Sequence, residues 1–227
     1  MSVEPVVTIR KDFARPNPEL ISALTGFPSG YFVDIQGRRG AMDSGIKPMF
    51  ASTPFIGCAV TVKSVPDDNL AAWAALDVAQ RGDVIVIGTG DWIGSAVIGD
   101  LVAGFYRNAG VAAVVTDGAV RDIAGLEDVG VPIYARALTP NSPQKNGPGL
   151  VGGNISIGGV SVRSGDIVVG DRDGIVVLPL SLFESAVQAV EAIRAKERQV
   201  EKTIADGASK PEWVDALLSS DAVKYVE

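Results

Sequence analysis

The stretch GDVIVIGTGDWIGSAVIGDLVAGFYRNAGVAAVVTDGAVRD, residues 82–122, decides the fold. It holds two solidly apolar runs, DVIVI and VAAVVT, on either side of a segment that predicts a helix from Ser95 or Asp100 through Asn108. Strands as apolar as these are typical of a parallel sheet that is covered on both faces. The stretch therefore predicts a β-α-β unit of an α/β protein.

The same alternation extends to both sides of this stretch. A strand is predicted over residues 57–65 and a helix over 68–80 before it, and another strand over 131–135 after it. Beyond Ala137, short apolar runs follow one another closely and are joined by Gly-Asp and Arg-Asp-Gly turns. Such closely spaced runs are typical of antiparallel or mixed pairing. We therefore expect a central parallel or mixed sheet that is flanked by helices.

Helices are predicted at both ends of the chain. A short helix covers residues 18–25, and a long helix runs from Ser181 to about Ile204, with Ser181 and Glu184 at the spacing of a capping box. No internal repeat, low-complexity segment or linker interrupts the sequence. We therefore predict a single domain over residues 1–227, with an N-terminal helical segment and a C-terminal helical extension.

The absence of histidine limits the chemistry of this chain most strongly. Among 227 residues there is no histidine and a single cysteine, Cys58, which lies in an apolar run and is expected to be a plain buried residue. Ser-His and Cys-His nucleophile pairs, imidazole bases and histidine-containing zinc sites are therefore excluded. A bound metal would meet mainly oxygen ligands, which favours Mg²⁺, Mn²⁺ or Ca²⁺.

Charge and hydropathy narrow the expected partners and compartment. The net charge is −7 and no cluster of Lys and Arg stands out, which argues against nucleic acid as a partner. No apolar run approaches the roughly 18 residues that a membrane helix needs, and the first residues lack the pattern of a secretory signal. Because a lone cysteine also suits a reducing compartment, we expect a cytoplasmic protein without a membrane partner.

The main candidate site combines Asp100 with Arg121 and Asp122. The intervening residues suffice for one helix, one strand and one turn, so both positions should lie at the same edge of a parallel sheet, where ligands bind in open α/β sheets. Backbone amides from Gly99 to Val102 could hold a substrate carboxylate at a helix start. Arg121 offers a planar fork for a carboxylate or an enolate oxygen, and the two aspartates offer oxygen to a hard cation. From spacing alone, a helix cap at Asp100 and a surface ion pair at Arg121–Asp122 explain the same residues equally well.

Two glycine-rich turns and one lysine are alternative candidates. The turn at 88–94 resembles a dinucleotide-binding turn, but its spacing is GxGxxxG and it does not open a first β-α-β unit. The turn at 170–174 resembles a calcium loop but lacks the alternating acids and closing Glu of an EF-hand, so a hairpin turn is expected. Lys145 is expected to be a solvated loop residue that could reach a substrate. Three charged residues of the last helix are expected on its solvated face: Lys196, Glu197 and Glu201.

Five segments carry a resemblance to known proteins: PDDNLA (66–71), GDVIVI (82–87), GDL (99–101), GVAAVVTDGAVRD (110–122) and GGVSVRSGDIVVGDRDGIVVLP (158–179). Together they resemble the family of 4-hydroxy-4-methyl-2-oxoglutarate aldolases and regulators of ribonuclease activity A, formerly named dimethylmenaquinone methyltransferases. The resemblance covers most of residues 18–200. Its most specific part is Asp100 followed by Arg121-Asp122 at the end of VVTDGAVRD.

The resemblance implies a fold, an assembly and a set of roles. The fold would be a phosphohistidine-domain-like, swivelling β/β/α fold, assembled as a homotrimer or a hexamer with active sites at subunit interfaces. Arg121 would be the substrate-binding arginine and Asp122 the metal ligand. A neighbouring subunit would contribute a C-terminal acid that the sequence does not identify. The loop that holds the substrate carboxylate would be Gly99, Asp100, Leu101 and Val102.

The resemblance also implies an activity. Family members use Mg²⁺ or Mn²⁺ to cleave 4-hydroxy-4-methyl-2-oxoglutarate or 4-carboxy-4-hydroxy-2-oxoadipate, and many decarboxylate oxaloacetate. Both reactions pass through the pyruvate enolate, whose oxygen Arg121 would stabilise. Because histidine is absent, the expected base is a metal-linked water or hydroxide that Asp100 orients.

Two other functions remain open from the sequence. One is a non-catalytic regulator that binds a ribonuclease or a helicase, as some family members do. The other is a related enzyme that acts on a different 2-oxo acid. Retention of Asp100 and of Arg121-Asp122 favours catalysis, because a pure binding surface does not need this trio.

Overall fold

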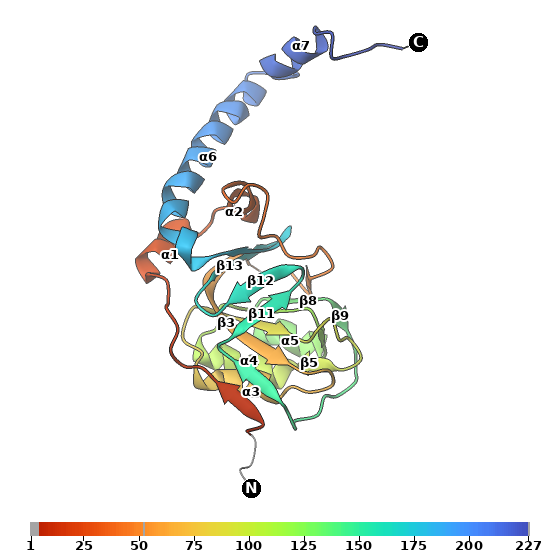
Figure 1. Ribbon diagram of the computed structural model, residues 1–227. Helices are drawn as coiled ribbons and strands as arrows, with labels where there is room; N and C mark the ends of the chain where they lie inside the picture. Colours follow the sequence, from red (N-terminus) through yellow and green to blue (C-terminus); the bar gives the residue numbers. More distant parts are fainter. Residues whose placement is uncertain (1–4, 52, 227) are drawn as a thin grey trace. The chain divides into compact units, whose positions relative to one another are not determined.

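The computed structural model describes residues 5–51 and 53–226 (Figure 1). The chain divides into two compact units, the first ending at Val187 and the second beginning at Gln188. The second unit contains most of the segment that was expected to form a C-terminal helical extension. The prediction of a single domain stays a prediction.

The apolar runs of the sequence form the centre of a mixed sheet. Four strands lie side by side, each parallel to the next: β3 (Phe55–Ser64), β4 (Asp83–Gly88), β6 (Ala113–Thr116) and β8 (Ile133–Ala135). Five further strands extend this sheet: β1 (Val7–Ile9), β2 (Lys47–Pro48), β10 (Gly149–Val151), β13 (Ile167–Asp171) and β14 (Gly174–Leu178). Because β2, β10 and β13 pair antiparallel with their neighbours in the central four, the predicted combination of parallel and mixed pairing is confirmed.

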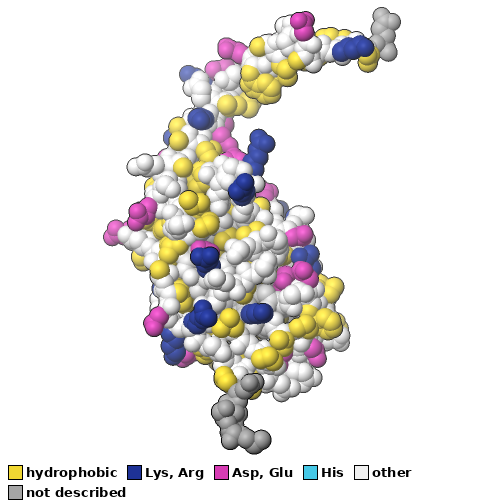
Figure 2. Space-filling view, viewed as in Figure 1, with side chains coloured by type: hydrophobic (Ala, Val, Ile, Leu, Met, Phe, Trp, Pro, Cys, Tyr) yellow, Lys and Arg dark blue, Asp and Glu magenta, His cyan; other side chains and the backbone are white. Residues whose placement is uncertain are grey.

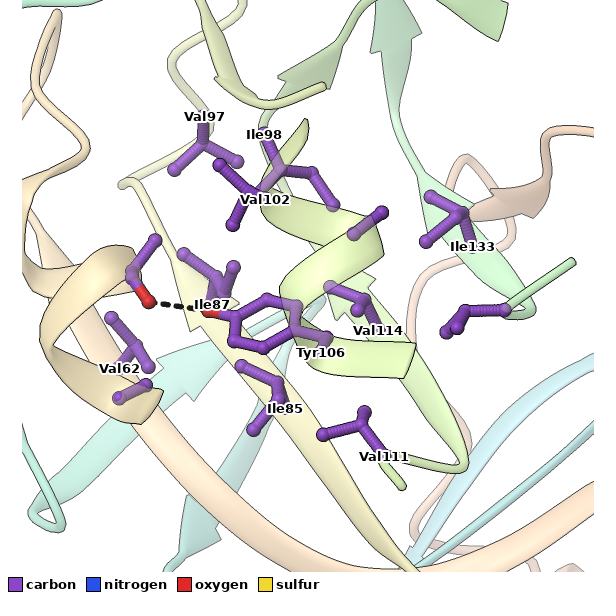
Figure 3. Packing of buried hydrophobic residues seen from close by; sticks show 14 of the residues in the cluster. Val62, Ile85, Ile87, Val97, Ile98, Val102, Tyr106, Val111, Val114 and Ile133 are labelled. Carbon is purple, nitrogen blue, oxygen red and sulfur yellow. Dashed lines mark hydrogen bonds between the residues drawn. The ribbon is translucent and has the colours of Figure 1, made fainter. Parts of the chain in front are cut away.

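Helices occupy the connections between the parallel strands. The connections are α3 (Leu70–Ala74) with the 3₁₀ helix η1 (Ala75–Asp77), then α4 (Asp100–Ala109), then α5 (Ile123–Val129). All three pack on one face of the sheet. In Figure 3, Tyr106 of α4 lies among Ile85, Ile87 and Val114, and its hydroxyl donates to the carbonyl oxygen of Ala72 in α3. Burial raises the pKa of Tyr106, so this hydroxyl stays protonated and available to donate.

A separate hairpin covers the other face of the sheet. It consists of β11 (Asn154–Ile157) and β12 (Val160–Arg163), whose apolar side chains pack on the side chains of β4 and β6 that point away from the helices. Gly158 and Gly159 form its turn with φ of 55° and 76°, a conformation that favours glycine. The order of layers is therefore strand hairpin, sheet and helices, as the β/β/α fold predicts.

A small parallel sheet continues beyond the carboxyl ends of the central strands. Its strands β5 (Ala96–Ile98), β7 (Ala119–Val120) and β9 (Ala137–Leu138) follow β4, β6 and β8 in the chain. Ser95 therefore precedes a strand, and the helix begins at Asp100, which decides between the two predicted starts. This small sheet carries the chain directly to the amino ends of α4 and α5.

The terminal helices lie partly where they were predicted. Asn17 caps α1 (Pro18–Leu24) by accepting from the backbone N–H of Glu19, and α2 (Ser29–Asp34) follows. The C-terminal helices are α6 (Phe183–Ala205) and α7 (Glu212–Leu218). On the second unit, apolar side chains gather over the end of α6 and over α7 (Figure 2), and the exposed ones include Val200 and Trp213. Within the described residues, no helix is long and apolar enough to cross a membrane.

Two local predictions are wrong. The helix predicted over 68–80 is shorter and tightens into η1, and the chain turns away from it where the Asp83 carboxylate accepts the backbone N–H of Gln80 at 2.7 Å. Ser181 does not form the N-cap of a capping box, because it lies inside the 3₁₀ helix η2 (Leu180–Leu182) that precedes α6. The buried Asp166, which lies between β12 and β13, instead accepts the N–H of Leu180 at 3.0 Å. The first N–H group of η2 is therefore capped by a residue that is distant from the helix in the sequence.

Gly57 in β3 provides a test of this sheet packing. A Cβ there would lie far inside van der Waals distance of the Gly82 carbonyl oxygen, which is backbone and cannot move cheaply. We expect Gly57→Ala to lower the free energy of unfolding by about 1–3 kcal/mol in chemical denaturation. Gly104→Ala is the matched control, because a Cβ on this helical glycine meets open space and should raise the stability by up to about 1 kcal/mol. Equal stabilities of the two variants would contradict the packing described.

Candidate active site

The predicted site residues come together at the amino ends of α4 and α5. Gly99 precedes α4 in an extended conformation, and a Cβ at this position would lie 2.5 Å from the Asp122 carboxylate and 3.2 Å from Cγ of Arg121. In the same way, a Cβ on Gly125 of α5 would lie 2.6 Å from the Asp100 carboxylate. Two glycines therefore allow the first turns of the two helices to approach closely, with a carboxylate in each gap.

Asp122 has an unusual backbone conformation. Its φ of 59° and ψ of 47° place it in the left-handed region, which costs a non-glycine residue about 1–3 kcal/mol. Although Asp122 occupies the N-cap position of α5, its side chain makes no capping hydrogen bond. Its carboxylate instead pairs with Nε of Arg121 at 3.2 Å. The conformation therefore turns the carboxylate away from its own helix and toward Gly99.

Arg121 is held in place by three contacts. Its backbone N–H donates to the carbonyl oxygen of Ile98 at 3.2 Å, and its guanidinium pairs with Asp122 and donates to Oγ of Ser142 at 2.5 Å. A guanidinium has five N–H donors. The arginine is therefore fixed in orientation and still able to bind a carboxylate or an enolate oxygen.

Asp100 makes a contact that the non-functional interpretation, a helix cap at Asp100, also predicts. Its Oδ1 accepts the backbone N–H of Leu101 at 2.7 Å, so it satisfies part of its own helix start. The Arg121–Asp122 pair is likewise present as an ion pair, with side chains that are 33% and 44% exposed. Both contacts of the non-functional interpretation therefore exist, but they occur in the wall of one cavity.

This cavity has a volume of about 130 Å³ and both charged and apolar walls. Lys145, expected to be solvated, is exposed and also lines the cavity. The remaining lining residues are Asn69, Trp73, Ala96, Ile98, Gly99, Asp100, Leu101, Val102, Arg121, Asp122, Ser142 and Pro143. The structure therefore brings together all six predicted site residues and adds a wall from α3 and from the loop after β9.

A buried aspartate positions that loop. Asp68 is 6% exposed, and its Oδ2 accepts the backbone N–H groups of Asn146 at 2.5 Å and Gly147 at 3.0 Å. The N–H of Asn69 donates to the Gln144 carbonyl oxygen at 3.0 Å. These bonds tie the segment around Lys145 to the start of α3. Sequence reasoning missed this role, because the spacing between residues 68 and 146 carries no local signal.

The glycine turn at 88–94 is not a dinucleotide site. The carboxylate of Asp117 is 2% exposed and accepts the backbone N–H of Thr89 at 2.7 Å, the hydroxyl of Thr89 at 2.9 Å and the N–H of Asp91 at 3.1 Å. A pyrophosphate would need these same amides and would be repelled by the buried carboxylate. The dinucleotide alternative is therefore wrong.

The turn at 170–174 is a hairpin turn, as expected. Asp171 pairs with Gly174 in the β13–β14 ladder, and the Asp171 carboxylate accepts from the backbone and hydroxyl of Ser29 at 2.7 and 2.8 Å.

Cys58 is buried at 4% exposure, and burial raises the pKa of its thiol to about 12. The described part of the chain contains no group of three or more His, Cys, Asp or Glu residues that could hold a metal by themselves. On α6, the three charged residues that were expected on its solvated face are exposed: Lys196, Glu197 and Glu201.

Comparison with known proteins identifies the family. A family model described as RraA-like, Aldolase/RraA, matches residues 19–177. The chain belongs to this family. A Halalkalibacterium halodurans protein named "Putative 4-hydroxy-4-methyl-2-oxoglutarate aldolase" is 38% identical over 165 residues, which cover 73% of this chain and 79% of that protein.

Solved structures of the RraA-like family have the same fold. Streptomyces coelicolor RraAS2, described as an unusual member of the RNase ES inhibitor RraA protein family, superposes with a TM-score of 0.76 at 28% identity, covering 84% of this chain and 99% of that one. The "RNA-processing inhibitor RraA from Thermus thermophilis" gives 0.62 at 29% identity, covering 67% and 92%. The predicted family and β/β/α fold are therefore confirmed. The relatives include a protein named as a putative aldolase, one named as an RNA-processing inhibitor and one described as a member of an RNase ES inhibitor family, so membership does not by itself choose a function.

Asp117 allows a test of how the 89–91 turn is held. Asp117→Asn replaces one acceptor oxygen by an NH₂ group that faces backbone N–H donors, so we expect the free energy of unfolding to fall by about 1–3 kcal/mol. Asp128→Asn on α5 is the control, because Asp128 is exposed and should change stability by less than about 0.5 kcal/mol. Chemical denaturation measures both. Equal stability of the two variants would mean that the Asp117 carboxylate does not hold the turn.

Proposed function

We propose that this chain is a divalent-metal-dependent aldolase. Its substrates would be 4-hydroxy-4-methyl-2-oxoglutarate or 4-carboxy-4-hydroxy-2-oxoadipate, which it would cleave to pyruvate and a second oxo acid, and it would also decarboxylate oxaloacetate. One observation carries the proposal: Arg121, two carboxylates and the start of α4 line a single cavity. The relative named as an aldolase agrees with it.

The start of α4 and Arg121 suit the 2-oxo acid end of such a substrate. The first N–H groups of a helix lack acceptors within the helix, and the helix dipole favours an anion there. In the proposed complex, the start of α4 from Gly99 to Val102 binds the substrate carboxylate through backbone amides other than that of Leu101, which already donates to Asp100, and Arg121 donates to the adjacent carbonyl oxygen. As charge develops on that oxygen, the bond from the fixed guanidinium strengthens.

Asp122 and Asp100 suit a hydrated hard cation. Mg²⁺ commonly binds one or two carboxylates and keeps several waters, so it does not need a closed protein cage. The Asp122 carboxylate in the gap left by Gly99, with Asp100 in the same cavity wall, fits this donor set. When bound, Mg²⁺ or Mn²⁺ would supply Lewis-acid polarisation of the 2-oxo acid.

The proton and electron movements follow from these positions. In the retro-aldol reaction the C4 hydroxyl loses its proton, the C3–C4 bond breaks and its electron pair forms the pyruvate enolate, which is then protonated at C3. Asp100 orients the water that takes the hydroxyl proton, because no histidine exists to act as base. In oxaloacetate the same C3–C4 bond breaks with loss of CO₂ and gives the same enolate.

The surroundings of the cavity support an assembled enzyme, which we propose to be a homotrimer or a hexamer with active sites at subunit interfaces. Leu101 in the first turn of α4 is 70% exposed, and Phe105 one turn later is 54% exposed. Large apolar side chains beside a polar cavity are typical of a surface that another subunit covers. An acid from a neighbouring subunit could then complete the cation site.

A regulator of a ribonuclease is the second candidate. The relatives from Streptomyces coelicolor and Thermus are described as inhibitors of RNA processing or of an RNase, which favours this function. It does not explain the left-handed conformation of Asp122 or the polar cavity. An activity assay distinguishes the two functions.

We expect the purified chain to release pyruvate from both aldol substrates and from oxaloacetate with Mg²⁺ or Mn²⁺, and to lose this activity with a chelator. Asp122→Asn should lower kcat/KM by about 100-fold or more, because it removes a charge from the proposed cation site. Asp128→Asn in the same helix is the control and should leave kcat/KM unchanged. No turnover of any substrate by a folded protein would reject the aldolase and favour the regulator.

Gly99 gives a second test that removes no functional group. Gly99→Ala places a methyl group against the Asp122 carboxylate and Arg121, so both side chains must shift. We expect kcat/KM for pyruvate release to fall by about 100-fold, while the melting temperature changes little because the added methyl group meets side-chain atoms and no backbone atom. Gly104→Ala in the same helix should keep full activity. Full activity of Gly99→Ala would show that the close approach of the pair to α4 is not needed for catalysis.

A further inference from the structure

A single Asn-Gly pair, Asn146-Gly147, occurs in this chain, in the loop between β9 and β10. Asparagine before glycine is the pair most prone to deamidation, because glycine has no side chain that shields its backbone nitrogen from the asparagine side chain. Asn146 is exposed, so water reaches it. It follows Lys145 of the cavity wall but has no part in the proposed catalysis.

Deamidation proceeds through a ring that these two residues form. The backbone nitrogen of Gly147 bonds to Cγ of Asn146 and gives up its hydrogen, and the Cγ–Nδ2 bond breaks with release of ammonia. Water then opens the ring. Cleavage of the new N–Cγ bond gives aspartate, whereas cleavage of the bond from this nitrogen to the backbone carbonyl carbon gives isoaspartate. The overall reaction exchanges ammonia for water and creates a carboxylate at residue 146.

The folded chain holds the attacking nitrogen away from this reaction. Oδ2 of the buried Asp68 accepts the backbone N–H of Asn146 at 2.5 Å and that of Gly147 at 3.0 Å. These two bonds, here named the Asp68 latch, direct both N–H groups toward the interior. To reach Cγ of the exposed Asn146, the Gly147 nitrogen must therefore leave the latch.

Contacts on both sides of the pair prevent its backbone from turning while the latch is closed. The N–H of Gln144 donates to the Asp67 carbonyl oxygen at 2.7 Å. The N–H of Gly149 donates to the Val6 carbonyl oxygen at 3.0 Å, and a Cβ on Gly147 would lie far inside van der Waals distance of that same oxygen. The ring can therefore close only in a locally open state of this loop.

We propose that Asn146 is a deamidation site and that opening of the Asp68 latch sets its rate. Isoaspartate adds a methylene group to the main chain between residues 146 and 147, so the two N–H groups no longer match a single carboxylate oxygen. The new carboxylate is also repelled by Asp68. Conversion therefore keeps the latch open and releases the loop that carries Lys145. This inference goes beyond the proposed function, because the conversion requires no catalysis by the chain.

The test compares deamidation with local opening. The protein is incubated at mildly alkaline pH, folded and chemically unfolded, and the exchange of ammonia for water at each asparagine is followed by peptide mapping and mass spectrometry. We expect folding to slow conversion of Asn146 by about the factor by which it slows hydrogen exchange of the Gly147 amide. Asn141, which precedes Ser142, is the internal control and should stay intact in the folded protein, because its Nδ2 donates to the Gly94 carbonyl oxygen at 2.8 Å.

Two variants separate the latch from the pair. Asp68→Asn has one acceptor oxygen and an NH₂ group in place of the carboxylate, so we expect conversion of Asn146 to accelerate by about 10-fold or more. Asn146→Gln should show no conversion, because its ring would need an additional atom. It also measures the isoaspartate that arises at Asp-Gly pairs such as Asp173-Gly174. If Asp68→Asn does not fold, the comparison of deamidation with hydrogen exchange in the original sequence still decides.

Three outcomes would overturn the inference. They are equal rates at Asn146 in the folded and the unfolded chain, a folded Asp68→Asn protein that converts no faster than the original sequence, and an unfolded chain in which Asn146 converts no faster than Asn141. We also expect pyruvate release to fall as Asn146 converts, and to persist in Asn146→Gln under the same incubation. If no substrate is turned over at all, the aldolase proposal fails by itself, and the mass measurement still decides on the deamidation site.

Discussion

Four parallel strands that are buried on both faces constrain the rest of the first unit. Side chains that alternate along β3, β4 and β6 alternate between two apolar clusters, one under the helices and one under the β11–β12 hairpin. Each strand can return in parallel only through a crossover, and here each crossover carries a helix. The amino ends of α3, α4 and α5 therefore all lie at the carboxyl edge of the sheet. The cavity occupies this edge because the burial of the strands requires these helices.

Aspartates of the first unit include two groups with different surroundings, one buried among loop and helix amides and one partly exposed in the cavity wall. Asp68, Asp117 and Asp166 are nearly fully buried, and each accepts two or more hydrogen bonds from loop or helix amides. A carboxylate can accept from several amides at once, so each of these side chains provides acceptors for backbone N–H groups of a loop or a helix start. Asp100 and Asp122 instead keep partly exposed carboxylates in the cavity wall. The buried aspartates hold the loops in place, whereas the exposed pair lines the cavity.

The sequence predicts the strands and the central trio well because both depend on local spacing. The runs DVIVI and VAAVVT are apolar throughout, and a helical crossover of fixed length returns Arg121 to the level of Asp100. The cavity wall from α3 and from the loop after β9 could not be predicted in the same way. Asn69 and Lys145 line the same cavity because Asp68 binds the loop that follows β9, a contact between segments more than 70 residues apart. The true cap of η2 was missed for the same reason, since Asp166 lies 14 residues before the amide that it accepts.

The conformation of Asp122 bears on the choice between an enzyme and a binding surface. A left-handed aspartate costs about 1–3 kcal/mol, and an N-cap side chain that does not cap forgoes about 1 kcal/mol more. A helix start that only had to fold would gain both by letting Asp122 cap α5. Contact with another protein does not require this loss, because an exposed carboxylate can be presented from an unstrained turn. The proposed chemistry does require it, because the carboxylate would have to lie beside Arg121 and Gly99 to share one small ligand with them. Asn69 and Trp73 in the same cavity carry two of the four buried side-chain atoms that lack a partner among the described residues, and the other two belong to Ser64 and Arg136. The strained conformation of Asp122 is the feature that the proposed catalysis on a small acid explains and that a regulatory surface leaves without a cause.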